Sequence, residues 1–327
     1  MKYAQQITAI SALGALLLVA TGCSKSAESH SHATSQNQAI TFSGEYPISV
    51  VCTTGQVAEM VVRIGGEHIK VETMMGPGVD PHLFRPVHSD VEKLSSAEAI
   101  FFNGMHLEGR MSDLFVKMAR SKATYAVTEG LQDRSDKRLR EPPEFEGMYD
   151  PHLWHDVALW SDCARDVAEN LAEFDPSNAD SYRKNMEAYV GELAELHQFC
   201  TDEIAKIPAD RRVLVTAHDA FGYFGKAYGL EVFGLKGIST EEEKDLAHQE
   251  VIQKMIIERK IPAVFVESAV APRTIEALVE PCQDAGHDLK VGGELFADAL
   301  GEAGTDESTY TGMIRHNVRT IVKALSE

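Results

Sequence analysis

The chain has 327 residues, and its 31 Lys and Arg stand against 50 Asp and Glu, which gives a formal net charge of −19. Such an acidic chain lacks the basic surface that neutralises phosphates, so we expect no nucleic-acid partner. Hydrophobic residues make up 44% of the sequence, enough for an ordinary core. The length allows about two domains of about 150 residues each. Five cysteines in so long a chain exclude a disulfide-dense scaffold.

The first residues indicate an export signal. Lys2 precedes an apolar run at 7–19, and small residues then lead directly to Cys23. This order is typical of a secretory signal peptide, and small residues directly before a Cys resemble a bacterial lipobox. We therefore expect cleavage after residues 1–22 and lipidation of Cys23; the alternative is an ordinary signal peptide with an incidental Cys. The polar, Ser-rich residues that follow predict a flexible tether over 23–44.

Four cysteines remain once Cys23 is set aside: Cys52, Cys163, Cys200 and Cys282. In an exported protein they could form two disulfides, and four cysteines allow three pairings. None has the close C-x-x-C spacing of a zinc knuckle or a redox motif. Cys52 lies in an apolar strand pattern, where we expect a buried free thiol. The pairing of the others stays open.

Short apolar runs recur along both halves of the chain. Near-continuous apolar strands separated by helical patterns are typical of parallel sheets covered on both faces. The sequence therefore predicts an α/β fold with two doubly wound (β/α) lobes rather than one large sheet. The runs lie at 46–54, 69–75, 99–103 and 124–127 in the first half, and at 212–217, 231–235, 263–267 and 289–292 in the second.

One long helix is predicted between the two lobes. Its apolar residues recur at steps of three and four, as one face of an α-helix requires. Asp175 supplies a start signal and Pro208 a stop signal. The expected domains are a first lobe over 45–175, the linking helix over 176–208 and a second lobe over 209–327. The apolar positions are Tyr182, Met186, Tyr189, Leu193, Leu196, Cys200, Ile204 and Ile207.

Four polar positions stand out in the predicted loops. His82 and His152 each complete an Asp-Pro-His sequence, whereas His218 and Asp298 follow predicted strands. Ligands of open α/β sheets bind at the carboxyl ends of strands, so we expect two side chains from each lobe to line one interlobe cleft. Proline fixes its own φ, and a ligand on a stiff loop loses less entropy on binding.

Three imidazoles and one carboxylate form a suitable set for a divalent metal ion. Neutral imidazole nitrogen suits zinc and also manganese or iron, whereas carboxylate oxygen suits the harder ions. The hypothesis from the residues is therefore one divalent ion, held by His82, His152, His218 and Asp298.

Longer segments carry a resemblance to a known family. They are GVDPHLF at 78–84, NGMHLEG at 103–109, DPHLW at 150–154, AHDAFGYFGKAYGL at 217–230, GISTEEE at 237–243, VFVESAVAPRTI at 264–275 and GGELFADALGEAGTDESTYTGMIRHNVRTI at 292–321. Together they resemble the metal-binding solute-binding proteins of bacterial ABC importers, the TroA/ZnuA/PsaA-like group. The resemblance covers about residues 45–327, and its last segments are most similar to the TroA-like branch.

The resemblance implies two (β/α) lobes joined by a long helix, with the family's ligand positions at His82, His152, His218 and Asp298. It implies an exported lipoprotein, facing the periplasm or the cell exterior, that delivers its ion to an ABC permease and the associated ATPase. We expect a monomer without enzymatic activity, attached to the membrane through its lipid anchor.

In that family, the residue at the third ligand position differs between members that are specific for different metals. Several manganese-specific members carry Glu where this chain has His218, and zinc-specific members often carry a His-rich loop before the second ligand. Residues 128–149 contain no His. This combination resembles the branch described for zinc and manganese together, so we expect Zn²⁺ or Mn²⁺, with Fe²⁺ less favoured. Affinity alone would favour zinc over manganese.

Three further residues are candidates for supporting roles. His155 follows His152 by three residues and could chelate with it if the segment is helical. The favoured alternative places His155 at the surface or behind the ligands. Asp219 and Glu267 lie near expected strand ends, where they could accept hydrogen bonds from ligand imidazoles or cap helices.

A secreted zinc-dependent hydrolase and a surface adhesin with a structural metal are the alternative functions. A hydrolase needs an open coordination position and a general base, and the chain contains no H-E-x-x-H, G-x-S-x-G or G-x-x-x-x-G-K-[ST] motif. Four protein ligands would close the site, which favours carriage over catalysis. An adhesin role is compatible with lipid anchoring and stays open as a second function.

Overall fold

The computed structural model describes residues 40–145 and 147–326. The predicted signal peptide, the lipidation site Cys23 and most of the tether lie outside these residues. Within the described ranges, no helix combines the length and the apolar character that crossing a membrane requires.

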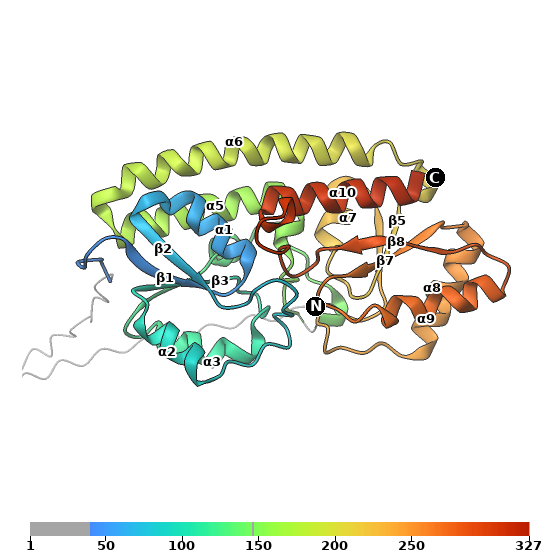
Figure 1. Cartoon of the computed structure of the whole chain (residues 1–327), viewed down its shortest axis with the longest axis horizontal. Helices are drawn as coiled ribbons and strands as arrows, with labels where there is room; N and C mark the ends of the chain where they lie inside the picture. The colour runs from blue at the N-terminus through green and yellow to red at the C-terminus, as the bar shows by residue number, and fades with distance from the viewer. Residues whose placement is uncertain (1–39, 146, 327) are drawn as a thin grey trace, which may run out of the picture. The chain divides into compact units, whose positions relative to one another are not determined.

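The first half of the described chain alternates strands and helices (Figure 1). Its elements are β1 (Ile48–Cys52), α1 (Gly55–Gly65), β2 (Ile69–Thr73), α2 (His88–Ser96), β3 (Ala99–Phe102), α3 (Ser112–Met118), β4 (Ala123–Ala126), α4 (Glu129–Asp133) and α5 (Val157–Phe174), with 3₁₀ turns at Gly66–His68, Gly109–Met111, Pro143–Phe145 and Leu153–His155. The strands form one parallel sheet in the order β2-β1-β3-β4. The central strand β1 is almost wholly buried, whereas most of the edge strand β2 is exposed.

The second half repeats the alternation. Its elements are α6 (Ala179–Ile204), β5 (Val213–Thr216), α7 (Gly222–Tyr228), β6 (Glu231–Gly234), α8 (Leu246–Arg259), β7 (Ala263–Glu267), α9 (Arg273–Asp284), β8 (Lys290–Leu295) and α10 (Tyr310–Ser326), with 3₁₀ turns at Pro176–Asn178, Ala209–Arg211 and Asp306–Ser308. Here the strands form two parallel pairs, β5 with β6 and β7 with β8. Strands β5 and β7 lie side by side without forming one continuous hydrogen-bonded ladder.

Each lobe has a small hydrophobic core of its own, and both lobes contribute residues to a larger shared core. Val51 and Ile100 pack with Leu94 of α2 and Phe115 of α3 on one face of the first sheet. Strands β5 and β7 pack in the same way against α8 and α9. The shared core contains residues of both sheets together with α5, α6 and α10; members include Phe101, Trp160, Leu196, Phe265 and Ile314. The two lobes therefore share buried apolar contacts along their common side.

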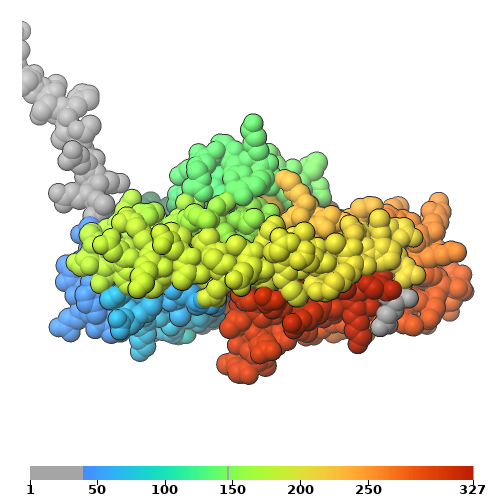
Figure 2. Space-filling model, turned by 90° about the horizontal axis from the view of Figure 1, so that it is seen from above, coloured from blue at the N-terminus to red at the C-terminus, as the bar shows by residue number. Residues whose placement is uncertain are grey.

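Helix α6 runs along both lobes, and the space-filling view shows it as a yellow-green to yellow band that borders the blue N-terminal segment at one end and the red α10 at the other (Figure 2). Its 26 residues correspond to about 39 Å. The predicted apolar stripe is buried, apart from a half-buried Met186. At its start, the Asp175 carboxylate accepts hydrogen bonds from Asn178, Tyr182 and Tyr46, at 2.8, 2.7 and 2.8 Å. The start signal therefore acts by joining the helix to the chain that enters β1.

The four cysteines of the described residues are free and buried: Cys52, Cys163, Cys200 and Cys282. The buried free thiol predicted for Cys52 is confirmed. Burial raises the pKa of this thiol, which favours the neutral form that packs in an apolar core.

Candidate metal centre

The four predicted ligand residues meet at one buried point. One ligand atom from each of His82, His152, His218 and Asp298 lies within 4.8 Å of the others. His152 and His218 are fully buried, Asp298 is 1% exposed and His82 is 5% exposed. Four separate segments of the chain therefore place imidazole and carboxylate groups around one small volume.

His218 follows β5 and Asp298 follows β8, as predicted. His82 lies in the loop between β2 and α2. His152 does not follow a strand directly, because α4 and a 3₁₀ turn separate it from β4. His152 is placed instead by the start of α5, where Asp156 caps the helix by accepting hydrogen bonds from two backbone N–H groups.

The Nε2 atoms of all three imidazoles face the Asp298 carboxylate. They lie 3.8 Å from it in His82, 3.5 Å in His152 and 3.3 Å in His218. Both Asp298 oxygens are buried without a hydrogen-bond donor among the described residues. A buried carboxylate is costly unless it is hydrogen-bonded, paired or bound to a metal, so this group fits a cation among the imidazoles.

Carboxylates hold two of the imidazoles from behind. His152 Nδ1 lies 2.8 Å from Asp150 Oδ1, and His218 Nδ1 lies 2.5 Å from Glu267 Oε2. With a metal ion bound, each Nδ1–H would donate to its carboxylate, which leaves the Nε2 lone pair for the ion. Glu267 thus lies directly behind the His218 ring, and the supporting role expected for it stays a prediction.

The site's charges shift the pKa values of its members in opposite directions. Burial lowers the pKa of His82 to about 3, so this imidazole stays neutral. Burial also acts to lower the pKa of His218, but the Glu267 and Asp298 carboxylates raise it well above its usual value. Burial would raise the pKa of Asp298, and the surrounding imidazoles, His218 above all, hold it below its usual range.

Arg140 lies behind His152 and forms an ion pair with Asp150. Its backbone N–H donates to the Tyr223 hydroxyl at 3.0 Å, and that hydroxyl donates to the Asp150 carbonyl at 3.1 Å. The guanidinium lies so close to Gly222 that any side chain there would collide with it. The supporting role predicted for Asp219 is wrong, because its carboxylate turns towards Arg140, at 3.9 Å, and makes no hydrogen bond to an imidazole of the described chain.

His155 is fully buried, so a surface position for it is wrong. It is outside the group of four convergent ligand atoms. Its Nε2 lies 3.1 Å from the Ala297 carbonyl, which also accepts a 2.8 Å hydrogen bond from Trp154 Nε1. Its ring packs on Phe221 at 4.3 Å. His155 and Trp154 thus hold the residue directly before Asp298.

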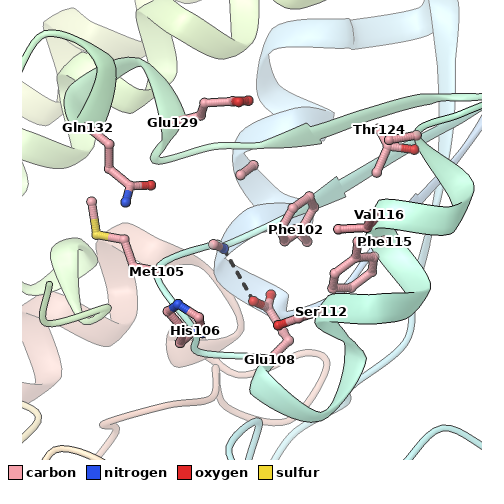
Figure 3. A pocket seen from close by; sticks show the side chains of 13 residues that line it. Phe102, Met105, His106, Glu108, Ser112, Phe115, Val116, Thr124, Glu129 and Gln132 are labelled. Atoms are coloured by element: carbon pink, nitrogen blue, oxygen red, sulfur yellow. Dashed lines mark hydrogen bonds between the residues drawn. The ribbon is translucent and has the colours of Figure 1, made fainter. Parts of the chain in front are cut away.

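A separate pocket of about 350 Å³ lies beside β3 and β4. Figure 3 shows Met105 and His106 near Gln132 on one side of it, and Phe115 on another. Glu108 accepts a hydrogen bond from the Gly104 N–H at 3.2 Å and so fixes the loop that carries His106. His106, which the sequence analysis did not select as a ligand, lines this pocket rather than the histidine cluster.

Sequence reasoning missed the supporting residues Asp80, Asp150 and Arg140. The signal for the first two was the repeated Asp-Pro-His itself, which was interpreted only through its proline. In both repeats the Asp carboxylate accepts a hydrogen bond from the histidine N–H two residues later, at 2.9 Å for His82 and 3.0 Å for His152. No local pattern marked Arg140.

Comparison with known proteins is consistent with this geometry. A family model described as ZnuA, zinc-uptake complex component A, periplasmic, matches residues 50–324. The chain belongs to the ZnuA family. Within the ZnuA family, it is 43% identical to the manganese-binding lipoprotein MntA of Bacillus subtilis over 284 residues, which cover 86% of this chain and 91% of MntA. It is 42% identical to the zinc-binding protein TroA of Treponema pallidum over 277 residues, which cover 85% of this chain and 88% of TroA.

The solved structure of the periplasmic zinc-binding protein TroA of Treponema pallidum has the same architecture. It matches with a TM-score of 0.81 at 42% sequence identity, covering 85% of this chain and 99% of the TroA chain. The predicted α/β class, with parallel sheets in two lobes and one long helix, is therefore confirmed for this ZnuA-family member.

Proposed function

We propose that the protein captures one divalent transition-metal ion, zinc or manganese, outside the cytoplasm and delivers it to an ABC permease. The observation that carries this proposal is the buried convergence of His82, His152, His218 and Asp298. Family membership supports it, because the matching family model describes a component of a zinc-uptake complex. The ion is the cargo of the protein.

The donor set fits such an ion in charge as well as in position. Asp298, Glu267 and Asp150 bring three buried carboxylates to the site, and of these three Arg140 is paired only with Asp150. A divalent cation would offset the remaining charge. Three nitrogens and one oxygen fill a tetrahedral shell for zinc, and both donor types also suit manganese.

The relatives do not favour one of the two metals. MntA is named for manganese and TroA for zinc, at 43% and 42% identity to this chain. Most N/O sites bind zinc more tightly than manganese, so selectivity depends on geometry and on metal supply. The proposal therefore includes both ions.

Carriage fits the site better than hydrolysis. A zinc hydrolase leaves one coordination position open and keeps a free general base beside it. Here four protein ligands converge, and the nearby Glu267 accepts hydrogen bonds from His218 at both its backbone N–H and its Nδ1.

The protein acts in this proposal as a monomer held at the membrane by lipid on Cys23. The relatives MntA and PsaA carry the word lipoprotein in their names, and PsaA of Streptococcus pneumoniae is named as the substrate-binding component of a manganese ABC transporter. The partner of this chain is accordingly an ABC permease with its ATPase.

Titration calorimetry of metal-stripped protein with Zn²⁺ and with Mn²⁺ tests the proposal. We expect one ion per chain, and a loss of affinity above about 100-fold in His82→Ala and in Asp298→Ala, since supporting residues alone are worth about 10- to 100-fold. His88→Ala and Asp288→Ala, at exposed positions, are the matched controls. Unchanged affinity in both site variants would refute the proposed site.

A further inference from the structure

The His82 ring is held by different contacts from those that hold the other two imidazole ligands. No carboxylate of the described residues accepts a hydrogen bond from its ring, whereas Asp150 and Glu267 hold the rings of His152 and His218. The Asp80 carboxylate holds only its backbone: Asp80 Oδ1 accepts from the His82 N–H at 2.9 Å. The position of His82 therefore depends on Asp80.

The second oxygen of Asp80 is held by the other lobe. Asp80 Oδ2 accepts a 2.6 Å hydrogen bond from the Thr240 hydroxyl. Thr240 is 4% exposed and lies in the loop between β6 and α8, while Asp80 lies between β2 and α2. This hydrogen bond thus joins the two lobes beside the metal centre.

The loop of Thr240 is also joined to the segment of His218. The Lys236 N–H donates to the Ala217 carbonyl, and the Asp219 N–H donates to the Gly237 carbonyl, both at 3.0 Å. These two bonds flank His218 on either side. A short chain of hydrogen bonds therefore connects the backbone of a second-lobe ligand, through Thr240 and Asp80, to the backbone of His82.

We propose that Thr240 is a positioning residue that couples closure of the two lobes to the placement of His82. The inference rests on the proposed function, because it concerns release of the captured ion. When the lobes separate, the hydrogen bond between Thr240 and Asp80 breaks. The loop that carries His82 then loses this support from the second lobe, and His82 becomes the first ligand to leave. The donor is a buried hydroxyl, and its acceptor is a carboxylate oxygen at 2.6 Å.

The carboxylates that hold the other two imidazoles stay in the same lobe as their histidines during such a movement. Glu267 ends β7 and His218 follows β5, so their hydrogen bond lies within the second lobe. Tyr223 of the second lobe donates to the Asp150 backbone carbonyl, but the Asp150 carboxylate that holds the His152 ring is paired with Arg140 of the first lobe. Among these three carboxylates, Asp80 is the one with a described hydrogen bond to the opposite lobe, so loss of support at His82 follows directly from opening.

Stopped-flow transfer of Zn²⁺ from the loaded protein to an excess of chelator tests the coupling. Thr240→Val, which removes the hydroxyl at nearly constant size, should speed metal release about tenfold. Thr240→Ser keeps the hydroxyl and should release at the wild-type rate. Ser239→Ala is the matched control, because among the described residues its hydroxyl accepts a hydrogen bond from the Glu241 N–H of the same loop and from no residue of the first lobe. If Thr240→Val does not fold, Thr240→Ala gives the same comparison.

A double-variant cycle separates coupling from a general loosening of the loop. In an Asp80→Asn background, Thr240→Val should accelerate release less than about twofold, because the hydrogen bond is already weakened. Equal acceleration in both backgrounds, or a release rate for Thr240→Val equal to that of Ser239→Ala, would overturn the inference.

Failure of this inference and failure of the proposed function give different results. If wild-type protein binds no Zn²⁺ or Mn²⁺, or if His82→Ala binds as tightly as wild type, the proposed function fails. If wild type binds one ion and His82→Ala does not, but Thr240→Val releases metal at the wild-type rate, only the role of Thr240 is rejected.

Discussion

His82 and His152 complete the same Asp-Pro-His sequence, yet the structure fastens them differently. In the second repeat, Asp150 holds both the backbone and the ring of the histidine, and Arg140 pairs with it from behind. In the first repeat, Asp80 holds only the backbone, and its other oxygen is engaged by Thr240 of the opposite lobe. The tripeptide therefore determines the local turn, while residues distant in sequence decide whether the ring is fixed.

The largest expected effect is on metal affinity, when the carboxylate that holds the His218 ring is changed. Glu267→Gln removes the charge that makes His218 a stronger ligand, and we expect metal affinity to fall about 100-fold in mildly alkaline buffer. Competition titration against a chelator measures the loss, with Glu258→Gln at an exposed position of α8 as the control. An unchanged affinity would show that the hydrogen bond from the His218 ring to Glu267 does not make His218 a stronger metal ligand than His82.

The pH dependence should follow the raised pKa of His218. The Glu267 and Asp298 carboxylates outweigh burial, so His218 is protonated in the metal-free protein at neutral pH. A bound ion must displace that proton. Affinity should therefore rise with pH by about tenfold per unit until the raised pKa is reached, and should fall towards acid. Calorimetry in buffers of different ionisation enthalpy should detect the released proton at neutral pH; its absence would contradict this assignment.

Asp150→Asn should weaken binding less than Glu267→Gln does, by about tenfold. Part of the charge on Asp150 is already balanced by Arg140, whereas no Lys or Arg of the described ranges pairs with Glu267. The two variants should be compared in the same competition titration. A larger loss for Asp150→Asn would show that the backbone turn matters more than the charge behind the ring.

The smallest effect is expected at the surface pair beside Thr240. Arg110 and Glu241 join the lobes by an ion pair whose side chains are 29% and 43% exposed. Exposed pairs contribute little and are screened by salt, so Arg110→Gln should change the metal release rate by about twofold or less. A large, salt-sensitive change would mean that the ion pair, rather than Thr240, holds the lobes together at this edge.

Most of the fold could be predicted from local patterns. The predicted apolar runs correspond to β1 to β8. The largely buried strands β1, β3, β5 and β7 need such runs because both of their faces are covered. The stripe from Tyr182 to Ile204 likewise marked α6, whose buried face is continuous. The division of the second sheet into two pairs was not predictable, since apolar runs carry no information on which strands form ladders. The domain boundaries stay predictions.

The sequence features that marked the four ligand residues do not mark the residues that hold those ligands in place. His218 and Asp298 follow strands, and the Asp-Pro-His repeat marked His82 and His152. Asp219 and Thr240 contact distant segments of the chain, as do the buried His155 and the half-buried Arg140. Such contacts depend on how the two lobes pack, and a single sequence has no local signal for them.

X-ray absorption spectroscopy of the zinc-loaded protein is the sharpest test of the four-ligand centre, because it reports the atoms bound to the ion. We expect four light-atom ligands at about 2.0–2.2 Å, with outer-shell scattering from three imidazoles that drops to two in His82→Ala. Sulfur scattering, or fewer than two imidazoles in the wild-type protein, would contradict a centre built from His82, His152, His218 and Asp298.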